Sequence, residues 1–139
     1  MRSRIFDCIT FFDNNYMFNL RYNILKEYVD YFYICESLYD HRGNKKKINF
    51  DKSKYYKSDK IKHLILQEPF PKSNNVWQNQ ALQREYLLKN LSKAAPEDYI
   101  FFSDPDEIPK PEILINFELN KKYGIFKQKC FNYKFNLFN

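Results

Sequence analysis

The chain of 139 residues has the length of a single domain and is long enough to bury a hydrophobic core. Hydrophobic residues make up 44% of it, which excludes a disordered chain, and the two glycines are too few for a glycine-rich phosphate-binding loop. The net charge of +6 favours a polyanionic partner such as a nucleic acid, an anionic membrane or a nucleotide diphosphate.

Cysteine use and hydropathy indicate the compartment. Cys8, Cys35 and Cys130 are too few and too widely spaced for a disulfide framework or a zinc site, so we expect buried thiols in a reducing compartment. No signal peptide is recognisable, because Asp7 and Asp13 interrupt the first apolar run, and no stretch is long enough for a transmembrane helix. These features predict a cytoplasmic protein and leave open a peripheral contact with a membrane.

The first three predicted elements are a strand, a helix and a second strand. Ile5 to Phe12 and Val29 to Cys35 are β-branched and aromatic runs with few polar interruptions, which is typical of strands buried on both faces. Between them, apolar residues recur at helical spacing from Met17 to Tyr28, and Asn14 or Asn15 is the expected N-cap.

A polar, lysine-rich stretch from Tyr39 to Lys60 predicts a long solvated loop with one short helix. The elements expected after it are a strand, a helix, a strand, a short helix and one or two half-exposed strands, at His63–Gln67, Trp77–Leu91, Tyr99–Phe102, Pro111–Leu119 and Tyr123–Phe138. We expect Trp77 to lie in the core. We assign no role to His41 or His63, because no motif surrounds them.

This alternation of strands and helices predicts an α/β fold with a mostly parallel sheet flanked by helices. Acidic residues follow three of the strands, namely Asp13, Glu36 and the pair Asp104 and Asp106. Ligands of such sheets bind at the carboxyl ends of the strands. We therefore expect these carboxylates to gather along one edge of the sheet.

The tripeptide Asp104-Pro105-Asp106 directly follows an apolar strand. Its carboxylates suit Mg²⁺ or Mn²⁺, which need few protein ligands when a diphosphate supplies others. Pro105 stiffens the turn, and Glu107 adds a third acid as a metal ligand or as a supporting group. An ordinary turn is the alternative, since Asp-Pro often begins turns. The strand before the tripeptide and its place in the α/β order favour the metal site.

Three motifs occur in order along the chain, and they are Ile5-Phe6-Asp7-Cys8-Ile9-Thr10-Phe11-Phe12-Asp13-Asn14 with Asn19-Leu20-Arg21, Trp77-Gln78-Asn79-Gln80 with Gln83-Arg84, and Ser103-Asp104-Pro105-Asp106-Glu107-Ile108-Pro109. Together they resemble glycosyltransferase family 17, over nearly the whole chain. That family includes the enzyme that adds the bisecting N-acetylglucosamine to N-linked glycans. The resemblance implies a GT-A type, Rossmann-like fold, a divalent metal, UDP-N-acetylglucosamine as the donor and inversion at the anomeric carbon.

The resemblance also implies roles for single residues. Asp104 and Asp106 match the metal-binding acids. Asp13 and Glu36 fall where the strands of GT-A folds meet the uridine, so contacts with the base or ribose are expected. Arg84 lies on the helix before the metal motif and is a candidate for binding the diphosphate.

For two arginines, Arg84 and Arg21, the sequence allows two interpretations. The alternative for Arg84 is a surface residue paired with Glu85 or another acid. Arg21 forms an ion pair with an acid of the strand ends, or it is a plain exposed helix position.

Length is where the sequence departs from the family, whose members continue well beyond Asn139. We therefore expect residues 1–139 to be a nucleotide-sugar-binding domain that is incomplete at its C-terminus. An inverting transfer needs a general base, for which Glu107 and Glu112 are candidates by proximity in the sequence alone. The acceptor is expected to be a protein-linked or lipid-linked glycan.

Two other functions compete with catalysis. A non-catalytic module that binds a UDP-sugar is the first, motivated by the missing C-terminal part. A nucleic-acid-binding protein is the second, motivated by the positive charge and by the lysines and tyrosines between Lys52 and Lys62. Carboxylates at the strand ends would repel phosphates in the absence of metal, so we expect no nucleic-acid partner.

Overall fold

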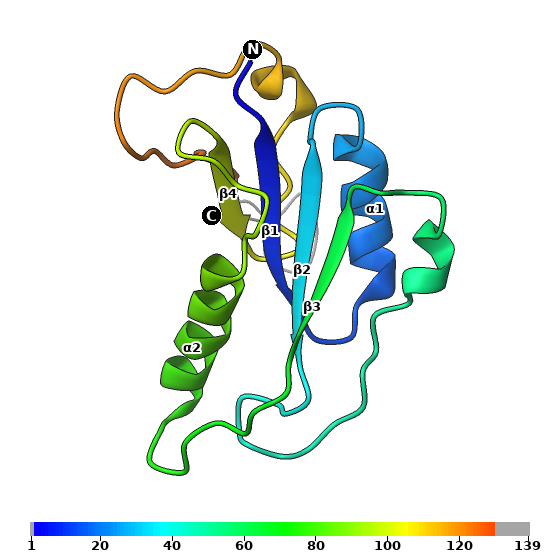
Figure 1. Ribbon diagram of the computed structural model, residues 1–139, viewed down its shortest axis with the longest axis vertical. Coiled ribbons are helices and arrows are strands. Elements are labelled where there is room, and N and C mark those ends of the chain that lie inside the picture. Colours follow the sequence, from blue (N-terminus) through cyan, green and yellow to red (C-terminus); the bar gives the residue numbers. More distant parts are fainter. Residues whose placement is uncertain (1, 130–139) are drawn as a thin grey trace.

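The computed structural model describes residues 2–129, which form a four-stranded, all-parallel sheet with helices on both sides (Figure 1). The strands are β1 (Ile5–Phe11), β2 (Tyr31–Ser37), β3 (Ile61–Leu66) and β4 (Tyr99–Ser103). The helices are α1 (Asn15–Leu25) and α2 (Val76–Lys89), and the short 3-10 helices are η1 (Lys52–Tyr55) and η2 (Pro111–Leu114). The predicted α/β class is confirmed, and so is the predicted order of elements as far as β4.

Alternation along β1 and β2 divides the core between the two faces of the sheet. The residues on the α1 face include Ile5, Ile9, Phe11, Phe32 and Ile34. Those on the α2 face include Phe6, Cys8, Tyr33 and Cys35. Because both faces are covered, the central strands read as continuous apolar runs, as the sequence predicted.

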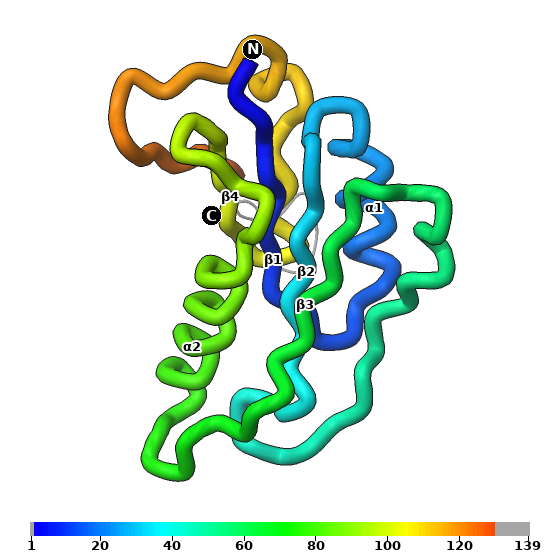
Figure 2. The backbone as a smooth tube through the Cα atoms, in the orientation of Figure 1, coloured from blue at the N-terminus to red at the C-terminus, as the bar shows by residue number. Residues whose placement is uncertain are grey.

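The strand order β3-β2-β1-β4 reverses direction at β1. The chain moves outward from β1 to β3, then crosses over through α2 and adds β4 on the other side of β1 (Figure 2). In parallel α/β sheets, the crevice at the carboxyl end of such a reversal is the usual place for a ligand. The topology therefore directs attention to the residues that follow β1, β2 and β4.

Helix α1 begins where an asparagine side chain replaces a missing backbone partner. The Asn14 side chain accepts a hydrogen bond of 2.9 Å from the N–H of Met17, which fits its predicted role as the N-cap. The inward face carries Phe18, Arg21 and Leu25, spaced three and four residues apart. One of these three buried side chains is charged, and its partners are described below.

Helix α2 turns a different face inward from the one that its apolar residues predicted. Its buried residues are Asn79, Gln83 and Leu87, whereas Trp77 is 75% exposed, so the prediction that Trp77 lies in the core is wrong. The two amides tolerate burial because they hydrogen-bond to backbone carbonyls, Asn79 to His41 and Gln83 to Cys35. Apolar periodicity cannot predict this inward face, because two of the three buried residues are polar.

The segment after β4 differs from the prediction at its end. The expected helix shrinks to the single turn of η2, and residues 123–129 contain no strand. Phe117 and Phe126 instead pack edge-to-face against Phe101 of β4. The rest of the predicted strand region, from residue 130 onward, lies outside the described residues. Within residues 2–129, no helix combines the length and the apolarity needed to cross a membrane.

Asp98 links the starts of two neighbouring strands. Its carboxylate accepts hydrogen bonds from the guanidinium of Arg4, 2.7 Å from Nη2, and from the backbone N–H groups of Arg4 and Ala95. The bond from Arg4 is the main reason that the pKa of Asp98 lies below its ordinary value. A lowered folded-state pKa stabilises the fold at pH values above the unfolded pKa of about 4, and this stabilisation is lost as the pH falls through the folded value.

We expect Asp98→Asn to lower the free energy of unfolding at pH 7, because the charge-assisted bonds to Arg4 are weakened. The difference from the wild type should shrink as the pH falls below about 4 and through the lowered folded-state pKa, at which the wild-type carboxylate becomes protonated as well. Urea unfolding followed by circular dichroism from pH 7 to pH 2 measures both effects. Glu97→Gln, at an exposed neighbouring position, is the control. A difference that stays constant with pH would contradict the role of the Asp98 charge.

Candidate functional site

A pocket of about 320 Å³ lies at the carboxyl ends of the strands, where the strand order reverses. It is lined by residues 10–14 after β1, by Ser37, Tyr39, Asp40, His41 and Lys46 after β2, by Gln80 and Gln83 of α2, and by residues 104–106 after β4. Three of the predicted site residues, Asp13, Asp104 and Asp106, therefore meet at one pocket. The expectation that these acids gather at one edge of the sheet is confirmed for them.

A buried ion pair between α1 and β1 lies directly behind the acidic turn. The Arg21 guanidinium binds both carboxylate oxygens of Asp7, at 2.7 Å from Nε and 2.7 Å from Nη2, and both side chains are 1% exposed. Arg21 thus forms an ion pair, as one of its two interpretations predicted. Its partner is an acid from within β1 and not one of the acids at the strand ends.

The remaining N–H groups of Arg21 hold the turn after β4. Nη1 donates to the carbonyl oxygens of Asp104 (3.0 Å), Pro105 (3.3 Å) and Glu107 (3.2 Å), and Nη2 donates to Oγ of Ser103 (2.7 Å). The backbone carbonyls of the turn point inward to Arg21, and this anchors the segment that carries the two acids. A short turn held at several carbonyl oxygens has little freedom to move its side chains away from the pocket.

The Glu107 carboxylate also stabilises this turn. Its Oε2 accepts a hydrogen bond of 3.0 Å from the backbone N–H of Asp104, which closes the turn from the outside. Glu107 is exposed and does not line the pocket, and Glu112 is exposed in η2. The structure therefore brings neither of the two candidate bases into the pocket wall, although Glu107 is adjacent to it.

Arg84 of α2 forms an ion pair with Asp104, with 3.1 Å between Nη2 and Oδ1. Its guanidinium lies over the ring of Phe102, 5.4 Å from the centroid. Of the acids that the alternative interpretation allowed, Glu85 is bound by Lys89, so Arg84 pairs with another acid, Asp104. Arg84 thus places a positive charge next to one of the two proposed metal ligands.

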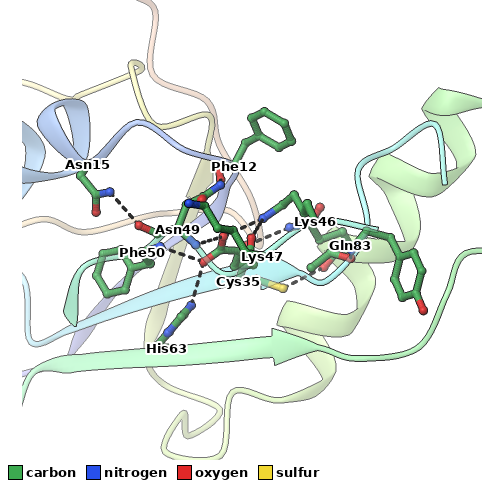
Figure 3. A network of polar contacts seen from close by, with 12 residues as sticks. Phe12, Asn15, Cys35, Lys46, Lys47, Asn49, Phe50, His63 and Gln83 are labelled. Carbon is green, nitrogen blue, oxygen red and sulfur yellow. Dashed lines mark hydrogen bonds and ion pairs between the residues drawn. The ribbon is translucent and has the colours of Figure 1, made fainter. Parts of the chain in front are cut away.

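Glu36 is buried inside the protein and does not line the pocket. Its carboxylate accepts hydrogen bonds from Nζ of Lys46 (2.7 Å) and from the backbone N–H groups of Asn49 (2.7 Å) and Phe50 (3.1 Å), and Nε2 of His63 lies 3.3 Å away at ion-pair distance (Figure 3). The predicted contact with the nucleotide does not fit this position, because partners from the protein already surround both oxygens.

Electrostatics at Glu36 follow from these partners. Burial alone would raise the pKa of the carboxyl, but the contacts from His63, Lys46 and the two backbone N–H groups outweigh it and lower the pKa. Glu36 is therefore a charged anchor that holds the segment after β2 against the sheet. Of the lysines expected in a solvated loop, Lys45 and Lys47 are exposed, but Lys46 is drawn inward and lines the pocket.

Two further pocket residues, His41 and Gln83, have no role predicted from the sequence, although Gln83 belongs to the second of the three motifs. Both line the pocket, and Nε2 of His41 lies 2.7 Å from Oε1 of Gln83. The sequence signal for this contact is confined to α2, where Asn79 and Gln83 stand four positions apart and so share one face of the helix.

The described cysteines are buried and inert, as predicted for Cys8 and Cys35. Desolvation raises the pKa of Cys35 to about 12 and that of Cys8 further, so neither forms a thiolate at neutral pH. Among residues 2–129, no group of three or more acidic, histidine or cysteine side chains is arranged to hold a metal ion. A metal at Asp104 and Asp106 would therefore need further oxygen ligands from a bound molecule or from water.

Comparison with known proteins gives one clear match. The family model described as glycosyltransferase family 17 matches residues 1–127. No curated protein and no solved structure shows a significant match to the chain. The matched range contains every residue of the pocket.

We expect Arg21→Met to lower the free energy of unfolding by about 3–5 kcal/mol, because it leaves the Asp7 carboxylate buried without a counter-charge. The double variant Asp7→Leu with Arg21→Met should recover much of this loss, since no charge then remains buried. Chemical denaturation measures both values. Asn23→Ala, at an exposed position of the same helix, should change stability by less than about 0.5 kcal/mol. A double variant that is less stable than Arg21→Met would contradict this account of the pair.

Proposed function

The chain belongs to glycosyltransferase family 17 and is a glycosyltransferase, and from this premise we propose its donor and its metal site. The proposed reaction transfers N-acetylglucosamine from UDP-N-acetylglucosamine to a glycan acceptor, with Mn²⁺ or Mg²⁺ held by Asp104 and Asp106. The observation that carries the proposal is the meeting of both carboxylates with the ends of β1 and β2 in one pocket at the reversal of the strand order. That location is where α/β sheets bind nucleotides.

The chemistry of Asp104 and Asp106 fits a hard divalent cation. They supply carboxylate oxygens from alternate residues of an anchored turn, and the Asp104 side chain is 47% exposed and so accessible from solvent. Two protein ligands suit Mg²⁺ or Mn²⁺, which usually complete their coordination with phosphate oxygens and water. A cation bound there would neutralise negative charge on the departing nucleotide.

Arg84 supports binding of a diphosphate beside these acids. In the protein alone it neutralises Asp104, and a metal ion would take over that role. The guanidinium would then be available to phosphate oxygens, which arginine binds with charge-assisted hydrogen bonds. Asp13, exposed at the end of β1 and lining the same pocket, is proposed to accept hydrogen bonds from ribose hydroxyls.

We assign the general base of an inverting transfer to Glu107. One of its carboxylate oxygens closes the turn through the Asp104 N–H, and the side chain is exposed beside the metal acids, where an acceptor hydroxyl would approach. A carboxylate at that position would take the proton of the attacking hydroxyl. The acceptor is proposed to be a protein-linked or lipid-linked glycan.

We expect Asp104→Ala to abolish the Mn²⁺-dependent part of UDP binding, because it removes one of two protein ligands. Isothermal titration calorimetry with UDP, with and without Mn²⁺, measures this effect. Asp59→Ala removes an exposed carboxylate outside the pocket and should bind like the wild type. If Asp104→Ala binds UDP as tightly as the wild type and independently of Mn²⁺, the assignment of Asp104 as a metal ligand is wrong.

The same preparation tests turnover. Glu107→Gln keeps an oxygen that can accept the Asp104 N–H, so it should retain UDP binding and lose transfer. Transfer or donor hydrolysis by the wild-type chain, measured as UDP release, would exclude a module that only binds the donor. If Glu107→Gln transfers the sugar as fast as the wild type, Glu107 is not the general base.

Arg84→Met should change the affinity for Mn²⁺ and the affinity for UDP in opposite directions. Mn²⁺ alone should bind roughly threefold to tenfold more tightly, because the competing positive charge at Asp104 is gone, whereas UDP in the presence of Mn²⁺ should bind roughly tenfold more weakly. Titration of Mn²⁺ by electron paramagnetic resonance and of UDP by calorimetry gives both values. Lys89→Met, which removes one positive charge from the exposed side of the same helix, is the matched control. Weaker Mn²⁺ binding in Arg84→Met would contradict the proposed competition.

A further inference from the structure

His41 is held in the pocket wall from two directions by the buried polar face of α2. Its ring contacts Gln83, with 2.7 Å between Nε2 and Oε1, and its backbone carbonyl accepts a hydrogen bond of 3.0 Å from Nδ2 of Asn79. Asn79 and Gln83 are each 3% exposed. Two buried amides that converge on one histidine make it a fixed part of the pocket and not a mobile loop side chain.

The hydrogen bonds around Gln83 determine which nitrogen of His41 carries the proton. The Nε2 amide group of Gln83 lies 2.8 Å from the carbonyl oxygen of Cys35, which can only accept, so the nitrogen of the amide must face β2. The amide oxygen therefore faces His41, and it too can only accept. In the neutral ring the proton is consequently on Nε2, and Nδ1 keeps its lone pair.

The Nδ1 atom of His41 has no hydrogen-bond partner among residues 2–129, while the residue itself lines the pocket. The contacts that join His41 to α2 use its Nε2 atom and its backbone carbonyl, so they leave the Nδ1 atom unused beside the pocket. An oriented imidazole with a free lone pair is suited to accept an N–H or O–H group of a bound molecule.

We propose that Nδ1 of His41 accepts a hydrogen bond from the nucleoside half of the sugar-nucleotide donor. This inference rests on the proposed function and adds to it a residue that determines how the donor is held. Gln83 is a positioning residue in this scheme, since it acts on the donor only through the tautomer and orientation of His41.

The strand order favours the nucleoside over the transferred sugar. His41 follows β2 and the proposed metal acids follow β4, and these two strands lie on either side of β1, roughly 10 Å apart across the sheet. A donor held by its diphosphate at Asp104 must extend across β1 to reach His41.

The two ends of the pocket also differ in their exposure. The lining that comes from α2 and from the end of β2 includes the buried Gln83 and Ser37, whereas Asp106 after β4 is exposed. The reacting sugar carbon must stay open to an acceptor, so the enclosed end suits the half of the donor that does not react.

Two substitutions of His41 test the roles of its two ring nitrogens separately. His41→Gln places an amide near the position of Nε2 and removes the acceptor at Nδ1, whereas His41→Asn keeps an acceptor near Nδ1 and loses the reach to Gln83. Calorimetry in the presence of Mn²⁺ should show His41→Gln binding both UDP and UDP-N-acetylglucosamine about tenfold more weakly than the wild type, the effect of one lost hydrogen bond. His41→Asn should stay within about threefold of the wild type for both.

A second readout does not depend on affinity. Long-range ¹H–¹⁵N correlation spectra of the wild type should show the proton of neutral His41 on Nε2, and addition of UDP should shift the Nδ1 resonance. Thermal melting of each variant checks that the fold is retained. A proton on Nδ1, or His41→Gln binding UDP as well as the wild type does, overturns the proposal.

The outcomes distinguish this inference from the proposed function. Wild-type binding of UDP that needs Mn²⁺ and Asp104 but is insensitive to His41→Gln refutes the His41 contact and leaves the metal site standing. A loss confined to UDP-N-acetylglucosamine, with UDP unaffected, refutes the nucleoside assignment in favour of the sugar. A wild-type chain that binds neither ligand refutes the proposed donor and the His41 contact together.

Discussion

The buried ion pair between Arg21 and Asp7 is the constraint on which the proposed site depends. Burying two charges costs more than an ordinary ion pair returns, and it is tolerated only when geometry is good and the remaining donors are satisfied. Arg21 meets both conditions, with two bonds to the carboxylate and others to the turn after β4. The carbonyl oxygens that accept these hydrogen bonds belong to the turn that carries Asp104 and Asp106, so the bonds from the guanidinium also position both acids. Stability of the α1 face and placement of the two proposed metal ligands therefore both depend on the Arg21 side chain.

A second buried charge organises the neighbouring strand in a similar way. Glu36 at the end of β2 lies on the same face of the sheet as Asp7 and collects Lys46, His63 and two backbone N–H groups (Figure 3). On the opposite face, Asn79 and Gln83 hold His41. The segments after β2 and β4 are thus each tied back to the sheet or to α2 by buried polar contacts. The pocket is built from loops, but anchors in the regular elements define its walls, as binding sites require for precise placement.

The acids predicted to act at the strand ends divide into two kinds once the fold is formed. Asp13, Asp104 and Asp106 stay at the pocket, where they are accessible to a ligand. Glu36 is withdrawn into the protein, as is Asp7 within β1, and both hold other groups in place. An acidic side chain beside a strand end can serve either purpose, and the difference lies in whether basic side chains and backbone donors converge on it from other parts of the chain. The first of the three motifs, which contains Asp7, Asp13 and Arg21, therefore includes one acid of each kind: Asp13 lines the pocket and Asp7 anchors Arg21.

Local patterns in the sequence were sufficient for the elements and their order as far as β4. Strand runs, helical periodicity, the Asn14 cap and the turn at Asp104 are short-range features, and together they led to the α/β class and to the carboxyl edge of the sheet. Partners that are distant in the chain decided the rest. The Arg21 bond to Asp104 joins residues 83 positions apart, and Glu36 gathers groups from a loop and from β3. The inward face of α2 and the importance of His41 likewise became visible only in three dimensions, because buried polar residues are chosen by the hydrogen bonds available to them and not by their hydropathy.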